Sequence, residues 1–175
     1  MRITGGEFGG RRLQSPKDDR VRPASDKVRL AVFNALMSRM NLEGARVLDG
    51  FCGTGSYGLE ALSRGAAHTT FIDQSRNSIT LTQKNINELG VQDRTTILCC
   101  NLIGALPNSE EGAMDLIFLD PPYAQDLLVP ALQQLQTGGW MGDGTLCVLE
   151  HEPGFTIPGA EVKSYGDTSI SFLHK

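Results

Sequence analysis

The chain has no long hydrophobic run and few aromatic residues. Its 175 residues are 40% hydrophobic and 6% aromatic, with a single tryptophan. No stretch approaches the roughly 18 uninterrupted apolar residues that a membrane helix needs. The first residues, Met1–Gly6, lack the apolar block of a signal peptide. We therefore expect a soluble, cytoplasmic protein, long enough for one sizeable core and too short for two ordinary domains.

Metal-ligand and disulfide patterns are also absent. The four cysteines, at positions 52, 99, 100 and 147, include no Cys-x-x-Cys pair and have no histidine at ligand spacing. The sequence therefore predicts reduced thiols and no bound metal. It also contains no internal repeat and no low-complexity segment.

The chain lacks an overall basic charge, although its first part is basic. Residues 1–30 hold eight basic and four acidic residues, a net charge of +4, whereas the other eight basic and sixteen acidic residues give −8. We expect a basic arm over residues 1–24 and a main domain over residues 25–175. A solvated, partly flexible terminus is the alternative. The candidate phosphate contacts in and just after the arm are Arg11, Arg12, Arg22, Lys27 and Arg29.

The start of the chain predicts a small hairpin followed by a helix. Residues 1–14 combine short β-prone pieces with two glycine pairs, which favours a hairpin or an extended arm. Ser25 can cap a helix over residues 26–40, whose apolar residues repeat at three-and-four spacing. Lys27 and Arg29 lie off that apolar stripe, where solvent or a ligand could reach them.

From residue 46 onward the pattern alternates between strands and helices. Because helical connections between strands imply right-handed crossovers, this alternation predicts an α/β fold with a mostly parallel sheet. Residues 161–173 predict a final antiparallel hairpin, which makes seven strands. The other expected strands cover about residues 46–51, 68–73, 94–100, 114–119 and 144–150. The expected helices between them cover about residues 56–64, 75–89 and 125–137.

A glycine-rich turn follows the first of these strands. Gly53 begins a Gly-x-Gly-x-x-Gly pattern, and Asp73 ends the next strand about 20 residues later, as in dinucleotide-binding folds. These features suit NAD and S-adenosylmethionine equally. Asp49 favours S-adenosylmethionine, because a carboxylate there would repel a pyrophosphate but attract an ammonium or a sulfonium. A tight turn without a cofactor is the alternative. The candidate cofactor contacts are Asp49, Phe51, Gly53, Thr54, Gly55, Asp73, Gln74, Asn101 and Asp120.

Asn101 has two interpretations. It follows a predicted strand at a place where a side-chain oxygen could accept a hydrogen bond from the adenine amino group. It could equally cap a helix.

The motif Asp120-Pro121-Pro122-Tyr123 closes another apolar strand. An exocyclic base amine is a poor nucleophile because its lone pair is delocalised into the ring. If the Asp120 side chain and the Pro121 carbonyl each accept one N–H, the lone pair can turn toward a methyl donor. Tyr123 could stack on the base. We therefore predict Asp120, Pro121 and Tyr123 as catalytic residues, the alternative being a proline-stiffened exit loop with a surface tyrosine.

Several stretches resemble the RsmD family, bacterial methyltransferases that act on a guanine exocyclic nitrogen in small-subunit ribosomal RNA. They are Met1–Gly6, Arg22–Arg29, Val47–Ala66, Ile117–Tyr123 and Tyr165–Thr168. The resemblance implies a Rossmann-like class I methyltransferase with a final antiparallel hairpin. It also implies S-adenosylmethionine at the glycine turn and Asp73, and the target base at Asp120 to Tyr123. The implied substrate is 16S ribosomal RNA in a partly assembled small subunit, and we expect a monomer.

The chain departs from the usual family pattern without losing a catalytic group. Asp73 replaces a more common glutamate and Asn101 replaces an aspartate. Other departures are Leu30, Gly50, Cys52, Ser56 and Tyr57.

Three other functions fit parts of the pattern. The Asp-Pro-Pro-Tyr motif serves an adenine N6 amine as well as a guanine N2 amine, and only the resemblance favours guanine. The glycine turn alone also fits a nicotinamide oxidoreductase. A ribosome assembly factor that binds RNA without turnover is the non-enzymatic alternative.

Overall fold

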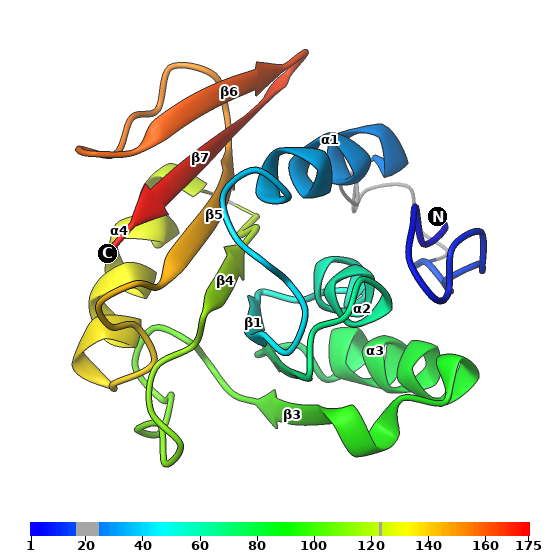
Figure 1. Cartoon of the computed structure of the whole chain (residues 1–175). Helices are drawn as coiled ribbons and strands as arrows, with labels where there is room; N and C mark the ends of the chain where they lie inside the picture. The colour runs from blue at the N-terminus through cyan, green and yellow to red at the C-terminus, as the bar shows by residue number, and fades with distance from the viewer. Residues whose placement is uncertain (17–24, 123) are drawn as a thin grey trace.

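One mixed seven-stranded sheet forms the centre of the molecule (Figure 1). The computed structural model describes the whole chain except residues 17–24 and 123 and the side chains of residues 124 and 125. The strand order is β3-β2-β1-β4-β5-β7-β6. The strands are β1 (Arg46–Gly50), β2 (His68–Asp73), β3 (Thr95–Cys99), β4 (Leu116–Leu119), β5 (Leu146–His151), β6 (Glu161–Tyr165) and β7 (Thr168–His174).

The sheet has a parallel part and an antiparallel edge, as the sequence predicts. Strands β3, β2, β1, β4 and β5 pair in parallel, and β7 pairs antiparallel with β5 and β6. All four residues of β4 are buried, which is typical of a parallel strand covered on both faces. The predicted final hairpin is confirmed: Tyr165 pairs with Thr168 around a turn in which Gly166 has a φ of 66°.

Helices cover both faces of the sheet (Figure 1). One apolar cluster joins α1, α2 and α3 to one face, and a second joins α4 to the other. None of the helices in the described part of the chain is long and apolar enough to cross a membrane. The helices are α1 (Asp26–Leu36), α2 (Ser56–Ser63), α3 (Arg76–Leu89) and α4 (Ala124–Thr137), with one short 3₁₀ helix at Gln92–Arg94.

Helix α1 begins as predicted but ends earlier. The Ser25 side chain caps it by accepting a hydrogen bond from the Val28 amide. The expected end at residue 40 is wrong, because the helix stops at Leu36. The Leu36 carbonyl accepts hydrogen bonds from the amides of both Arg39 and Met40. The bond from Arg39 is of the 3₁₀ type, which forms a tighter turn, and the chain then continues toward β1.

The N-terminal segment packs on the body beside α1, α2 and α3 (Figure 1). Ile3, Phe8 and Leu13 are buried and belong to the same core cluster as these helices. An antiparallel bridge between Arg2 and Arg12 closes the segment like a short hairpin. The expected domain boundary at residue 24 lies outside the described residues.

A buried ion cluster ties this segment to α1 and α2. The Glu60 carboxylate accepts hydrogen bonds from the backbone amide and the hydroxyl of Thr4, each at 2.7 Å. It also pairs with Arg29 at 3.3 Å and Arg64 at 2.8 Å, and Arg29 reaches Asp26 at 2.8 Å. The expectation that Arg29 faces solvent or a ligand is therefore wrong, because its side chain is 0% exposed. Its charge neutralises a buried carboxylate, so we withdraw it as a phosphate contact.

We predict that Glu60→Gln destabilises the protein by about 3 kcal/mol or more, because it removes the buried carboxylate that pairs with both Arg29 and Arg64 and leaves Arg29 with the partly exposed Asp26. Thermal and denaturant unfolding would measure this loss. Glu111→Gln, which breaks an exposed pair with Arg46 at 3.0 Å, is the matched control and should change stability little. Equal stability of the two variants would contradict the importance of the buried cluster.

Candidate active site

The predicted site residues gather along the carboxyl edge of the parallel strands. Asp49 lies in β1, Asp73 ends β2, and Asp120 directly follows β4. Because β1 lies between β2 and β4, residues from three separate stretches meet at neighbouring strand ends. Open α/β sheets bind their ligands at this edge.

The glycine turn after β1 is fixed by hydrogen bonds from β2 and α3. The Gly53 amide donates to Asp73 Oδ2 at 3.0 Å, and the Gly53 carbonyl accepts from the Thr82 hydroxyl at 2.9 Å. Phe51 has a φ of 58°, a left-handed conformation that a non-glycine residue seldom adopts. Such strained conformations are often found at functional sites.

Two glycines of this turn show why the motif needs glycine. A Cβ at Gly58 would lie 2.4 Å from the Phe71 ring, so α2 could not pack this closely on β2 with any side chain there. At Gly53, among the described residues, an added Cβ would come within 4 Å of the Phe51 carbonyl oxygen alone, at 3.9 Å. The backbone at Gly53 is therefore accessible to a ligand.

Asp49 is a buried carboxylate beneath this turn. Its Oδ2 accepts a hydrogen bond from the Gly58 amide at 2.8 Å, at the start of α2, and its side chain is almost fully buried. Burial raises the pKa of Asp49 to about 8, and the nearby charge of Asp73 adds to this rise. A cation near Asp49 would favour its ionised form.

Asp73 and Asn101 organise the ends of β2 and β3. Asp73 accepts the Gly53 amide on one oxygen and the Ser75 amide on the other. Gln74, the next residue, is exposed. Asn101 Oδ1 accepts the Ile103 amide at 2.9 Å in a side-chain turn. The interpretation of Asn101 as a helix cap is wrong, because the described chain between β3 and β4 contains no helix. The role of Asn101 toward adenine stays a prediction.

Asp120 and Pro121 lie beside the glycine turn. In the register of β1 and β4, Gly50 pairs with Leu119, so Phe51 and Asp120 are the next neighbours. Burial raises the pKa of Asp120 well above its usual value, and the charges of Glu150 and Asp49 raise it further. Pro121 is buried. Tyr123 lies outside the described residues.

Two further residues complete this edge, and the sequence analysis missed both. Leu119 of β4 pairs with Leu149 of β5, so the residues that follow them, Asp120 and Glu150, lie next to each other. The Tyr57 hydroxyl donates to Glu150 Oε2 at 2.9 Å. Burial raises the pKa of Glu150, whereas this hydrogen bond lowers it. An acidic residue directly after the apolar run Leu146–Leu149 was the available signal.

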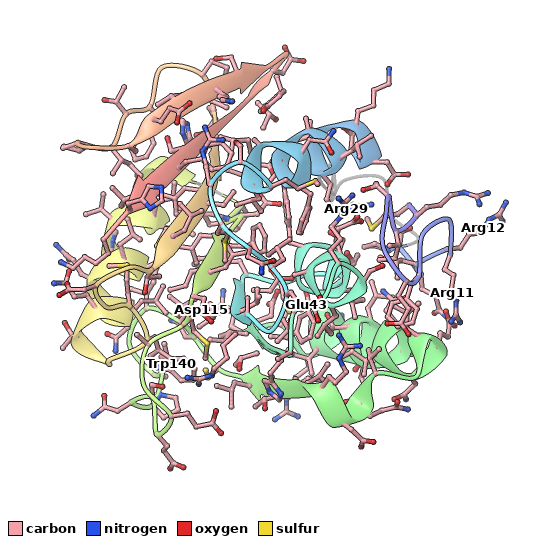
Figure 2. All side chains as sticks on the ribbon, viewed as in Figure 1. Arg11, Arg12, Arg29, Glu43, Asp115 and Trp140 are labelled. Atoms are coloured by element: carbon pink, nitrogen blue, oxygen red, sulfur yellow. The ribbon has the colours of Figure 1, made fainter. Side chains whose placement is uncertain are left out.

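The basic residues predicted to contact RNA lie in different environments. Arg11 and Arg12 are exposed on the N-terminal segment, and Figure 2 shows Arg12 pointing away from the body. Arg11 donates to the carbonyl of Glu88 at the end of α3. Lys27 is exposed on α1, and Arg22 lies outside the described residues. Arg29 is enclosed between α1 and the N-terminal segment (Figure 2).

Four carboxyl groups gather at this edge and carry negative charge only when they ionise. Among the residues that the structure describes, no ion pair neutralises them, and no group of three or more His, Cys, Asp and Glu side chains is arranged to hold a metal ion. Such a site suits a positively charged organic ligand and neutral N–H donors. The four carboxylates belong to Asp49, Asp73, Asp120 and Glu150.

The raised pKa of Asp49 predicts a pH-dependent stability difference. In the folded protein Asp49 keeps its proton up to about pH 8, whereas in the unfolded chain its pKa is near 3.8. Its stabilising contribution is therefore complete below pH 4 and is lost as the pH rises to 8, by at most about 1.4 kcal/mol per pH unit. Asp49→Asn, which stays neutral, should gain thermal stability relative to the native protein between pH 5 and 8. Melting curves that stay parallel over this range would contradict the buried, protonated state.

Known proteins are similar to this chain along nearly its whole length. The family described as "Conserved hypothetical protein 95" matches residues 1–173. Ribosomal RNA small subunit methyltransferase D of Escherichia coli K12 is 35% identical over 153 residues, which cover 87% of this chain and 75% of that protein.

Solved structures show the same fold. The structure of yhhF from Escherichia coli matches with a TM-score of 0.85 and 30% identity, over 100% of this chain and 97% of that one. The T. thermophilus 16S rRNA N2 methyltransferase RsmC, in complex with AdoMet and guanosine, has a TM-score of 0.68, 20% identity, and coverage of 91% of this chain and 44% of that one. This second likeness concerns the fold alone and confirms the expected class I methyltransferase architecture. The chain belongs to the family of ribosomal RNA small subunit methyltransferase D.

Proposed function

We propose that this protein transfers a methyl group from S-adenosylmethionine to the exocyclic N2 of a guanine in 16S ribosomal RNA. One observation carries this proposal above the others. The parallel pairing of β1 and β4 sets the glycine turn and the Asp120-Pro121 motif on adjacent strand ends, which lie about 4.8 Å apart in a sheet. A methyl donor at the turn and a base at the motif would therefore be in contact.

The described residues fit S-adenosylmethionine better than a dinucleotide. The open space at Gly53 allows a ligand to approach the backbone, and Asp73 can accept ribose hydroxyls on its remaining lone pairs. Asp49 lies below the turn with a carboxylate that would oppose a pyrophosphate. Phe51, Thr54, Gly55, Gln74 and Asn101 complete the set of proposed contacts. The named methyltransferase relatives support this choice.

The chain's own residues prepare the amine for attack. Bound S-adenosylmethionine would supply a methyl carbon made electrophilic by a positively charged sulfur. Asp120 and the Pro121 carbonyl each accept one N–H of the target amine, which turns the nitrogen lone pair toward that carbon. After the transfer the methylated amine would carry a positive charge, and Asp120 and the Pro121 carbonyl would hold its N–H groups until one proton passes to water. Tyr123 stacks on the base.

The substrate that we propose is 16S RNA in a partly assembled small subunit, bound by a monomer of this protein. A base inside structured RNA must be unstacked before its amine can reach the methyl group. Cations of the N-terminal part of the chain would hold the RNA backbone during this step. We retain Arg11, Arg12, Arg22 and Lys27 for this purpose.

Labelled methyl transfer tests the reaction and its catalytic motif together. Small subunits from a strain lacking this protein should accept label, and mass analysis should identify N2-methylguanine. Asp120→Ala should lower turnover by about 10²-fold or more, because it removes an acceptor that orients the amine. Asp120→Asn, which keeps a carbonyl oxygen, should retain more activity than Asp120→Ala. Because Asp120 is also a candidate cofactor contact, both variants are compared at saturating S-adenosylmethionine. Label found on adenine N6, or no transfer at all, would reject the proposal.

Neutralising Arg11 and Arg12 together should weaken RNA binding while leaving S-adenosylmethionine binding unchanged. Loss of two phosphate contacts should reduce the slope of log affinity against log salt by roughly 1 to 2. The matched control is Lys163→Gln combined with Lys175→Gln, which removes two charges remote from the N-terminal segment. A similar loss of RNA affinity in the control, or an equal loss of cofactor binding in the arginine variant, would show that the effect is not local.

A further inference from the structure

We propose that Glu150 is the residue that selects guanine, by accepting the N1–H of the target base. This inference rests on the proposed function, because it concerns the base whose N2 is held by Asp120 and Pro121. It adds a specificity-determining residue outside the Asp-Pro-Pro-Tyr motif.

The sheet sets Glu150 next to Asp120. In the parallel register of β4 and β5, Phe118 pairs with Val148 and Leu119 with Leu149, so Asp120 and Glu150 are the following neighbours. Adjacent parallel strands lie about 4.8 Å apart. A base that reaches Asp120 is therefore within reach of Glu150.

Both side chains point to the same face of the sheet. Side chains alternate along a strand, and Phe118 and Val148 both belong to the core cluster formed with α1 and α2. Two residues further along each strand, Asp120 and Glu150 face that same side. The hydrogen bond from Tyr57, a residue of α2, to Glu150 agrees with this direction.

Tyr57 holds Glu150 in a fixed orientation. Its ring is buried and stacks on Phe118 with centroids 4.9 Å apart and an interplanar angle of 21°. Its hydroxyl reaches Glu150 Oε2 at 2.9 Å. Among the contacts between described residues, this bond engages one carboxylate oxygen, so Oε1 can receive a donor from the base.

The chemistry of the base edge explains why this arrangement favours guanine. Guanine presents N1–H and the N2 amine side by side, so this part of its edge offers two adjacent donors. An ionised carboxylate pair such as Glu150 and Asp120 offers acceptors only. Adenine presents an unprotonated N1 beside its amine, and this nitrogen would face the Glu150 oxygen with no hydrogen between them.

Guanine would favour the ionised forms of both carboxyl groups. Burial raises the pKa values of Asp120 and Glu150, and the charge of Glu150 raises the pKa of Asp120 further, so each ionised group needs a hydrogen-bond donor. Two N–H donors from guanine would supply the hydrogen bonds that the ionised forms need. Adenine would supply one donor fewer.

Replacing Glu150 by glutamine should change the preferred base from one with a protonated N1 to one with an unprotonated N1. The glutamine amide offers one donor and one acceptor, so it matches a base with an unprotonated N1 and an intact 2-amino group. The base 2-aminopurine has both features and still carries the amine to be methylated. We therefore compare native protein and Glu150→Gln on small subunits reconstituted with guanine or 2-aminopurine at the mapped target position.

The native protein should methylate guanine faster than 2-aminopurine, and Glu150→Gln should lose guanine activity by about 10-fold or more and prefer 2-aminopurine. Glu152→Gln, an exposed change two residues away, should keep the native preference. S-adenosylmethionine binding and thermal melting check that each variant is folded.

The outcomes separate this inference from the proposed function. If native protein transfers no methyl group to guanine N2, the proposed function itself fails. If it does, but Glu150→Gln keeps the native preference for guanine, then Glu150 does not read N1. A folded Glu150→Gln variant that binds cofactor but loses activity on guanine and on 2-aminopurine equally would also overturn the inference.

Discussion

The parallel register of β2, β1, β4 and β5 is the constraint on which the site depends. It brings the ends of four strands together, and each strand contributes one carboxylate to this edge. These carboxylates come from residues as far apart in sequence as Asp49 and Glu150. Burial raises the pKa values of Asp49, Asp120 and Glu150, and neighbouring carboxylates raise the pKa values of Asp49 and Asp120 further. The site is therefore prepared for a cation and for N–H donors.

The rest of the molecule supports this edge. The apolar clusters on the two faces fix the strands, and the Gly58 contact with Phe71 lets α2 lie close enough to donate a backbone amide to Asp49. The Glu60 cluster holds the N-terminal segment against α1 and α2. This places Arg11 and Arg12, which we propose as RNA contacts, on a segment that packs against the body.

Local sequence patterns were sufficient for most of the fold. Apolar runs such as Leu116–Leu119, the glycine turn and the final hairpin each have a short-range signature, and the structure agrees with them closely. The motif at Asp120 was also visible, because a polar residue closing an apolar strand is unusual. The early end of α1 was missed, because residues 37–40 contain no glycine or proline to mark the turn at Leu36.

Long-range pairing explains what the sequence could not predict. Arg29 looked exposed by helical periodicity, yet Glu60, 31 residues away, buries its charge. Glu150 and Tyr57 acquire a functional position only when β5 lies beside β4 and α2 packs over both. Hydrophobic periodicity predicts which face of a helix or strand is apolar. It does not predict which charged residue of another element packs against that face.

Proton release on cofactor binding tests the electrostatic basis of the site most directly. Calorimetry at pH 7, in buffers of different ionisation enthalpy, counts the protons that leave the protein. Binding of S-adenosylmethionine should release a substantial part of one proton, because its positive charge lowers the raised pKa values of the buried carboxylates. S-adenosylhomocysteine, which lacks the sulfonium charge, should release less. Binding of both ligands with no proton release would show that these carboxylates are already ionised and would contradict the account.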